Sequence, residues 1–265
     1  MLQELESYKE VEEDIIDQIQ EIFRLAGKTK AIIGVSGGKD STVALHLCCR
    51  ALGPENVIGV IMPDGEQSDF NDAYNLCKSL DILYSTINIL SITKRFDALV
   101  DIETECASED WSNITVTEHS IKESKINIRP RVRMTVLRAL GQAYDALLCG
   151  TGNASEIYVG YFTKDGDSSC DFNPLENLTS IQVVELGLAM GIDPKLMNKV
   201  PSDGISGKTD EEKLGVSYKS IHDYLTKNLL TEKFSDEEIE EFKKIKELHE
   251  KSLHKLENGR SKIYP

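Results

Sequence analysis

Four short predicted strands, separated by segments with helical spacing of apolar residues, constrain the fold more than any other feature of this sequence. The strands cover residues 31–35, 57–62, 84–89 and 146–149, of which the first two are buried apolar runs, and the main helical segments cover residues 5–23, 42–52, 69–80, 132–143 and 181–190. Strands that are joined through helices run parallel, and strands that are apolar throughout are buried on both faces. We therefore predict an α/β fold built on an open, mostly parallel twisted sheet with helices on both faces.

The remaining segments are polar. Residues 108–127 show weak periodicity, which predicts a connector, and residues 202–213 are rich in Gly, Ser, Thr and Asp, which predicts a surface loop. The last forty residues predict a mostly charged helix that frays into a basic end at 259–262. Because no repeat or low-complexity linker divides the 265 residues, we expect a single domain over residues 1–265.

The overall charge limits the partners of the chain. A formal net charge of −15 disfavours a broad electrostatic grip on nucleic acid, which requires clustered Lys and Arg. No window approaches the roughly 18 consecutive apolar residues of a membrane span. The acidic N-terminal residues 1–13 also lack the basic-then-apolar pattern of a signal peptide. We expect a cytoplasmic protein that binds neither nucleic acid nor membranes.

The segment Gly34-Val-Ser-Gly-Gly-Lys-Asp-Ser41 follows an apolar run directly and opens a helical one. Helix N-termini bind anions through their free N–H groups and dipole, and paired glycines let the backbone approach phosphate closely. Ser36 and Ser41 add hydroxyl donors, and Asp40 adds a carboxylate that can hold Mg²⁺. A tight turn that needs glycine for its geometry alone is the alternative, but it would not require two serines and an aspartate. Lys39 is either a phosphate ligand or a solvated residue.

The spacing of this loop matches neither G-x-x-x-x-G-K-[ST] nor G-x-G-x-x-G. It resembles the S-G-G-x-D-S signature of the ATP pyrophosphatase superfamily, in which the loop grips the pyrophosphate end of ATP. The resemblance implies that ATP is bound by Gly34, Val35, Ser36, Gly37, Gly38, Lys39, Asp40 and Ser41.

Six later blocks resemble, in order, those of ammonia-dependent NAD synthetases. They are NIRPRVRM at 127–134, GTGNASE at 150–156, VGYFTKDGD at 159–167, DFNP at 171–174, PSD at 201–203 and DEEKLGVSY at 210–218. The resemblance covers roughly residues 5–256 and implies a Rossmann-like fold of the adenine nucleotide alpha-hydrolase kind. It also implies a ligase that amidates deamido-NAD with ammonia, forming NAD, AMP and pyrophosphate from ATP through an adenylated intermediate.

The family pattern also assigns the metal and the rest of the ATP site. It implies that Asp40 and Glu156 hold Mg²⁺, and that Thr151, Ser180 and Ser202 complete the ATP site. Glu156 follows a predicted strand end on the same sheet edge as Asp40, where ligands bind in open parallel sheets. A carboxylate that only stabilises a helix terminus is the alternative for Glu156.

The same pattern assigns the substrate. It implies that deamido-NAD is bound by Arg131, Lys164, Asp171, His254 and Lys255, and that Asp40, Glu156 and Asp171 are catalytic. A planar Arg fork and a Lys suit the pyrophosphate and carboxylate of this substrate, and Asp171 suits the positive pyridinium ring. A solvent ion pair is the alternative for Arg131, and a charged tail is the alternative for the His254-Lys255 pair.

Two positions depart from the pattern. Ser180 stands where the family usually has a lysine that reaches ATP phosphate, and Ser202 replaces a threonine. Thr179 and Gln182 fit a capping box, which would leave Ser180 at a helix start. Either Ser180 contributes only a hydroxyl, or another cation, Lys39 or Lys208, takes the place of the lysine.

The sequence offers no candidate glutaminase domain and no Cys-His set for one, so we expect free ammonia as the nitrogen donor. The resemblance further implies a homodimer, and residues 202–213 are a candidate loop for closing over the intermediate. A tRNA-modifying ATP pyrophosphatase would use the same loop at 34–41, but it predicts C-x-x-C pairs or a basic surface. A nucleotide-sensing module without turnover is the other alternative, favoured only by Ser180.

Overall fold

Four parallel strands form the centre of the computed structural model, which describes residues 2, 5, 7–67, 69–110, 115–199, 209–227 and 234–256. The strands are β1 (Lys30–Gly34), β2 (Val57–Ile61), β3 (Leu83–Thr86) and β4 (Ala146–Leu148), in the order β3-β2-β1-β4. All neighbouring pairs are parallel; Ala31 of β1 lies opposite Val57 of β2 on one side and Leu147 of β4 on the other. The predicted open parallel sheet is confirmed.

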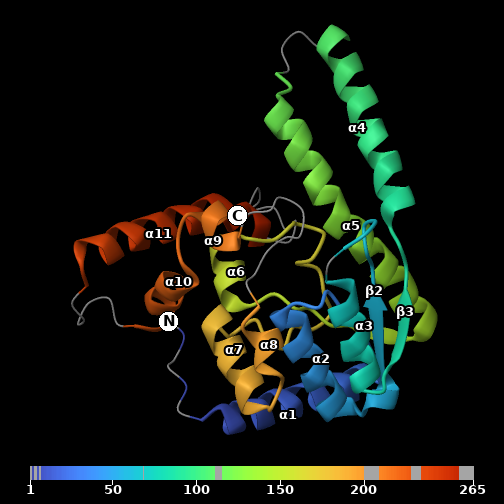
Figure 1. Ribbon diagram of the computed structural model, residues 1–265, viewed down its shortest axis with the longest axis vertical. Helices are drawn as coiled ribbons and strands as arrows, with labels where there is room; N and C mark the ends of the chain where they lie inside the picture. The colour runs from blue at the N-terminus through green and yellow to red at the C-terminus, as the bar shows by residue number, and fades with distance from the viewer. Residues whose placement is uncertain are drawn as a thin grey trace, which may run out of the picture.

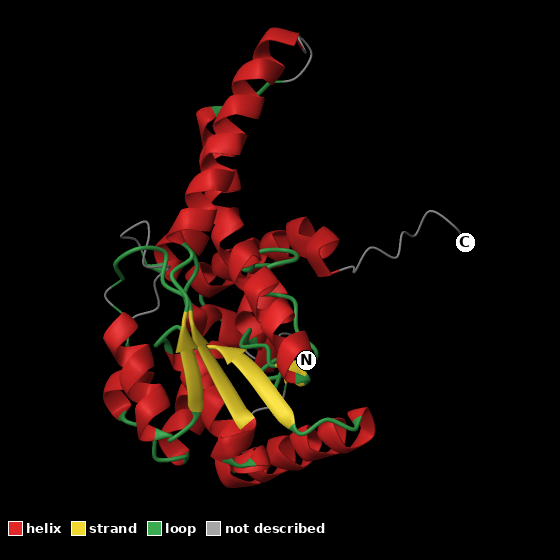
Figure 2. Ribbon diagram, turned by 90° about the vertical axis from the view of Figure 1, so that its right-hand side faces the viewer, coloured by secondary structure: helices red, strands yellow, loops and turns green. Residues whose placement is uncertain are grey.

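Helices cover both faces of this sheet (Figure 2). On one face, α1 (Tyr8–Ala26), α2 (Lys39–Leu52), α3 (Phe70–Ser79) and α7 (Ser180–Ala189) share one apolar core with β1 and β2. On the other face, α5 (Glu118–Tyr144) packs Val132 and Leu137 against Ile32 and Val60. The central strands β1 and β2 are almost entirely apolar because both of their faces are buried, whereas the edge strand β3 is largely exposed.

The prediction of a connector at 108–127 was wrong. The segment contains the end of α4 (Leu90–Asp110) and the start of α5, where the Thr117 hydroxyl accepts from the Ser120 N–H in a capping box. Figure 1 shows α4 and α5 projecting side by side from the body of the molecule. This half of α5 stands away from the core, so its sequence lacks the apolar periodicity by which helices are recognised.

The second half of the chain forms a smaller apolar cluster beside the sheet. It is built from α6 (Ala154–Val159), α9 (Asp210–Leu214), α10 (Tyr218–Thr226) and α11 (Asp236–Leu256), through the buried residues Val159, Leu214, Val216, Tyr218, Ile221, Leu225, Phe242 and Ile245. The charged helix predicted near the C-terminus is confirmed as α11. The loop predicted at 202–213 was wrong from residue 210, because a capping box between Thr209 and Glu212 starts α9 there; residues 202–208 and the basic end at 259–262 lie outside the described residues.

The short elements η1 (Pro54–Asn56) and α8 (Pro194–Met197) complete the fold.

The order of the strands fixes where a ligand can lie. The chain leaves β1 on one side towards β2, whereas β4 lies on the other side of β1. Open parallel sheets bind ligands outside the carboxyl ends of strands at such a reversal. The segments that follow β1 and β4 are the phosphate loop at 34–41 and the GTGNASE block at 150–156. Within the described ranges, no helix combines the length and apolarity that crossing a membrane requires.

Candidate active site

The loop at 34–41 turns from β1 into α2 around its two serines. The Ser36 and Ser41 hydroxyl oxygens lie 3.0 Å apart, and the Ser36 hydroxyl accepts from the Gly38 N–H at 3.2 Å. Gly38 is the N-cap of α2, and no side chain caps the first N–H groups of this helix. The helix start is therefore available to an anion such as a phosphate group.

Gly37 is required by the packing of this turn. Its φ is 78°, and a Cβ at this position would lie 2.8 Å from the Asp69 carbonyl oxygen and 3.1 Å from the Ala73 nitrogen. Any side chain would therefore be strained by its backbone conformation and would also collide with the start of α3. The glycine fixes how closely the loop approaches α3.

Asp40 and Glu156, the two carboxylates predicted to share one sheet edge, meet around Asn153. The Asn153 side-chain amide donates to Asp40 Oδ1 at 3.0 Å, and the Asn153 backbone N–H donates to Glu156 Oε2 at 3.1 Å. The Asn153 Oδ1 in turn accepts from the Glu156 N–H at 3.1 Å, which closes a capping box at the start of α6. Glu156 thus caps a helix, as the alternative interpretation stated, and also lies beside Asp40. Asn153 was not singled out from the sequence, although its N-x-x-E spacing is that of a capping box.

Lys39 is buried, with 6% of its surface exposed, so the alternative of a solvated residue was wrong. Its ammonium group donates to Asp40 Oδ2 at 2.6 Å. Asp40 is therefore bound on one side by Lys39 and on the other by Asn153.

The carboxylate pair has the chemistry of a cation site. Removal from water and the neighbouring Asp40 raise the pKa of Glu156 to about 8, and Lys39 offsets only part of this effect. A divalent cation would relieve the repulsion between the two carboxylates. Among the described residues, no group of three or more His, Cys, Asp or Glu side chains is arranged around a metal position. Two carboxylates completed by phosphate oxygens and water suit Mg²⁺, which takes few protein ligands.

The other predicted ATP residues lie at the neighbouring helix starts. Thr151 is in the turn between β4 and α6, and Ser180 is the first residue of α7. The Ser180 N–H donates to the Ser155 hydroxyl of α6 at 3.0 Å, which joins the two helix starts. The capping box predicted for Thr179 and Gln182 is confirmed. Ser202 and Lys208 lie outside the described residues.

Four of the residues predicted to bind deamido-NAD form a chain of contacts. Arg131 Nε donates to the Lys164 carbonyl at 3.2 Å, and Lys164 Nζ donates to the His254 carbonyl at 2.9 Å. Lys255 Nζ donates to the carbonyl oxygens of Gly160 and Phe162 at 2.8 and 3.1 Å. The end of α11 thus lies on the GYFTK segment and brings basic groups together. Arg131 is exposed and contacts a carbonyl, so its role towards the substrate stays a prediction.

Asp171 lies apart from these contacts. Its carboxylate forms an ion pair with Arg138 of α5 and accepts from the Leu148 N–H of β4 at 2.8 Å. The carboxylate is thereby held at the carboxyl end of β4. Its role towards the pyridinium ring stays a prediction.

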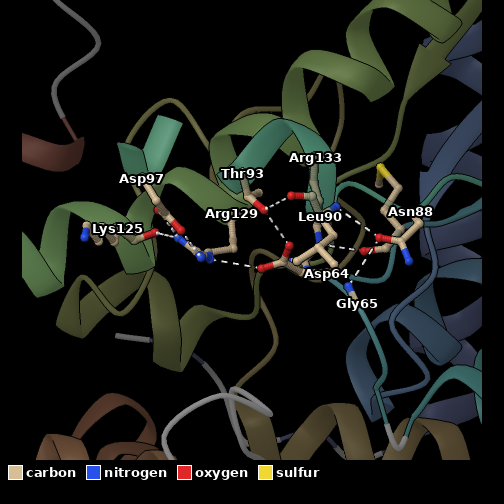
Figure 3. Close-up of polar contacts among 10 residues, drawn as sticks. Asp64, Gly65, Asn88, Leu90, Thr93, Asp97, Lys125, Arg129 and Arg133 are labelled. Carbon is tan, nitrogen blue, oxygen red and sulfur yellow. Dashed lines mark hydrogen bonds and ion pairs between the residues drawn. The ribbon is translucent and has the colours of Figure 1, made fainter. Parts of the chain in front are cut away.

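Two arginines of the NIRPRVRM block hold α5 in place. Arg129 donates to both carboxylate oxygens of Asp97 at 2.7 and 2.6 Å and to Asp64 at 3.0 Å, and Thr93 donates to the same Asp64 at 2.6 Å (Figure 3). Arg133, one helical turn later, donates to the Met62 carbonyl at 3.0 Å. These two arginines face α4 and β2, whereas Arg131 points to Lys164. The block thus combines two anchoring residues with one candidate substrate residue. The two anchors were not predicted from the sequence, although their i, i+4 spacing places them on one helix face.

Comparison with known proteins identifies the relatives of this chain. A family model described as NAD synthase matches residues 11–259. The NH(3)-dependent NAD(+) synthetase of Archaeoglobus fulgidus is 34% identical over 255 residues, which cover 95% of each protein. The structure of NMN synthetase from Francisella tularensis has a TM-score of 0.81 at 32% identity and covers 97% of this chain and 99% of its own. The NH3-dependent NAD synthetase from Campylobacter jejuni, in complex with the nitrate ion, has a TM-score of 0.72 at 25% identity, with coverages of 98% and 100%. The resemblance deduced from the motifs is confirmed: this chain belongs to the NAD synthase family.

Proposed function

We propose that this protein amidates deamido-NAD with ammonia, consuming ATP and releasing NAD, AMP and pyrophosphate. The observation that carries the proposal is the position of Asp40 and Glu156. The two carboxylates are linked through Asn153 at the carboxyl ends of β1 and β4, beside the uncapped start of α2. This arrangement suits a nucleotide triphosphate with its cation at the reversal point of the sheet.

The loop at 34–41 would hold the pyrophosphate end of ATP. The N–H groups of the first turn of α2 and the hydroxyls of Ser36 and Ser41 are donors for its oxygens, and Lys39 supplies a positive charge. Asp40 and Glu156 would hold Mg²⁺, which when bound neutralises charge on the phosphate oxygens. Thr151, in the turn before α6, and Ser180, at the start of α7, would complete the ATP site.

The chemistry is a two-step ligation that requires no protein nucleophile. In the first step an oxygen of the nicotinate carboxylate bonds to the α-phosphorus, and the bond from this phosphorus to the bridging oxygen of pyrophosphate breaks. In the second step ammonia bonds to the carbonyl carbon of the adenylate, the bond to AMP breaks, and nitrogen loses a proton. Positioning of the reacting groups and stabilisation of charge by the loop are the protein's contribution.

The basic groups around the end of α11 are the proposed substrate site. Arg131, Lys164 and Lys255 meet there through contacts with backbone carbonyls of the GYFTK segment and α11. A pyrophosphate and a free carboxylate, both present in deamido-NAD, match such a cluster. The position of Asp171 at the end of β4 supports a contact with the positively charged ring.

A second copy of this chain is the proposed partner. The apolar side chains Ile92, Phe96, Leu99 and Ile102 on α4 are 39%, 46%, 53% and 54% exposed. Their spacing places them on one side of this projecting helix, where a symmetric contact between two copies would bury them. The α4 surface, as we call these four residues, is thus the proposed dimer contact.

A second candidate reaction is the amidation of nicotinate mononucleotide to NMN by the same steps. The Francisella tularensis NMN synthetase favours it, because its TM-score of 0.81 and identity of 32% exceed the 0.72 and 25% of the Campylobacter jejuni NAD synthetase. Both reactions use the same nicotinate carboxylate, so the loop at 34–41 does not distinguish them. The second nucleotide of deamido-NAD is the difference between the substrates.

The test is to incubate the purified protein with ATP, Mg²⁺ and ammonium, together with either deamido-NAD or nicotinate mononucleotide. We expect NAD and pyrophosphate in equal amounts, with a higher kcat/KM for deamido-NAD, and no turnover by Asp40→Asn. A higher kcat/KM for the mononucleotide would select the second reaction. Release of pyrophosphate with neither substrate amidated would refute both.

A further inference from the structure

Tyr218, the first residue of α10, contributes a buried hydroxyl that has no hydrogen-bond partner among the described residues. The side chain is 7% exposed and belongs to the apolar cluster around α10 and α11. Its backbone is fixed, because the Tyr218 N–H donates to Glu211 Oε1 at 2.7 Å. A buried donor without an acceptor is destabilising and rare in native proteins, so its presence calls for a function.

The ring of Tyr218 lies at the candidate active site, although α10 is far from the phosphate loop in sequence. Lys39 Nζ is 5.7 Å from the centre of this ring, and the same ammonium group binds Asp40. Burial raises the pKa of the phenol, and the nearby Glu156, Asp210 and Asp40 raise it further. The hydroxyl therefore stays protonated and can approach an anion without charge repulsion.

Several carboxylate oxygens near Tyr218 accept hydrogen bonds from other donors, and none of them accepts from the Tyr218 hydroxyl. Asp210 Oδ1 accepts from the Tyr161 hydroxyl at 2.9 Å. The two oxygens of Asp40 accept from Asn153 and Lys39, and Glu156 Oε2 accepts from the Asn153 N–H. Because the hydroxyl has no partner among the described residues, an oxygen of a bound molecule could accept its hydrogen bond.

We propose that the Tyr218 hydroxyl donates a hydrogen bond to an oxygen of the polyphosphate of ATP, and to the pyrophosphate after it leaves. The phosphate loop places these oxygens beside Lys39 and Asp40, next to the Tyr218 ring. A water bound to a metal ion would be a weaker acceptor, because one of its two lone pairs is taken by the metal and it acts mainly as a donor. A phosphate oxygen carries negative charge and accepts strongly. This inference rests on the proposed nucleotide site and adds a binding residue from α10.

Tyr218→Phe tests the inference, because it removes only the hydroxyl. Tyr224→Phe is the matched control: Tyr224 lies on the same helix, and its ring contacts Tyr158 and Phe242 rather than the phosphate loop. Calorimetric titrations of the full chain with magnesium pyrophosphate, with Mg²⁺ alone and with AMP separate the sources of the acceptor oxygen. Thermal unfolding without ligand reports a structural role.

We expect Tyr218→Phe to raise the Kd for magnesium pyrophosphate about 10- to 100-fold, as for the loss of a hydrogen bond to a charged group. Binding of Mg²⁺ alone and of AMP should not change, and the ligand-free unfolding temperature should stay the same or rise. Unchanged pyrophosphate affinity, equal weakening of Mg²⁺ alone, or a lower unfolding temperature with unchanged affinity would each overturn the inference. Failure of the wild-type protein to bind magnesium pyrophosphate would instead refute the proposed nucleotide site, and the inference with it.

Discussion

Glu156→Gln tests whether the carboxylate pair destabilises the protein when no cation is bound. Removal from water and the nearby Asp40 raise the pKa of Glu156 from 4.5 to about 8. At about 1.4 kcal/mol per tenfold change in the ionisation constant, this corresponds to a free energy on the order of 5 kcal/mol. Glutamine also serves in a capping box, so the start of α6 should be preserved.

The sign follows from the protons bound in each state. The pKa of Glu156 is higher in the folded protein, so between pH 4.5 and about 8 the folded protein holds a proton that the unfolded chain has released. The contribution of this proton to stability is fully present below pH 4.5 and is lost as the pH rises through about 8. The free energy of unfolding of the wild-type protein should therefore fall across this range relative to that of Glu156→Gln.

Urea unfolding in the presence of a chelator measures this difference, from about pH 5 to about pH 9. We expect the free energy of unfolding of Glu156→Gln to rise relative to that of the wild-type protein by several kcal/mol between these two pH values. Glu176→Gln is the control, because Glu176 is exposed and its substitution should leave the profile of the wild-type protein unchanged. If the profiles of Glu156→Gln and the wild type stay parallel, the carboxylate pair is not strained, and the argument for a cation at this position is refuted.

Three further substitutions test the close approach of the loop to α3, the positive charge of Lys39 and the dimer contact. Gly37→Ala should lose at least about tenfold in ATP affinity by calorimetry, because its Cβ would meet the Asp69 carbonyl at 2.8 Å. Gly191→Ala is the control, because Gly191 also has a positive φ but a Cβ there would have no atom within 4 Å. Equal losses of ATP affinity in the two variants would refute the argument from close approach. Lys39→Met should raise the KM for ATP about 10- to 100-fold, as for a lost charged hydrogen bond, whereas an unchanged KM would assign Lys39 to structure alone. Phe96→Glu should raise the dimer dissociation constant at least about 100-fold by light scattering, since an apolar side chain is lost from both copies. Leu25 lies on α1 and is 70% exposed, so Leu25→Glu is the control and should leave the dimer intact. If Phe96→Glu still forms the dimer with unchanged affinity, the α4 surface is not the dimer contact.

The sequence predicts those elements whose pattern is set by burial in the sheet. β1 and β2 were found within one residue of their ends, because strands covered on both faces are apolar without interruption. The projecting half of α5 was missed for the opposite reason: its residues contact α4 and solvent, so their apolar spacing does not mark one buried face. The starts of α5 and α9 carried usable local signals in the capping residues Thr117 and Thr209.

The candidate site divides in the same way. That Asp40 and Glu156 lie on one edge follows from each carboxylate coming just after a strand, which the sequence shows. Their link through Asn153 depends on β4 lying directly beside β1, and the order of strands is a property of the whole sheet. Local patterns at Asn153 predict only the cap that it forms at α6.

Lys39 and Ser180 extend this argument to the charge of the site. Ser180 is 3% exposed at a helix start, so the position that usually supplies a lysine here holds a small buried hydroxyl. Lys39 is at the first position of α2, where local pattern alone indicates an exposed side chain, yet Tyr218 and Asp40 enclose it. The effective dielectric constant around a buried ammonium group is lower than around an exposed one. Its electrostatic attraction for a phosphate group at the helix start is therefore stronger. Lys39 therefore stays a candidate for the positive charge that a lysine at position 180 would have supplied, and its side chain lies against a ring from the distant helix α10.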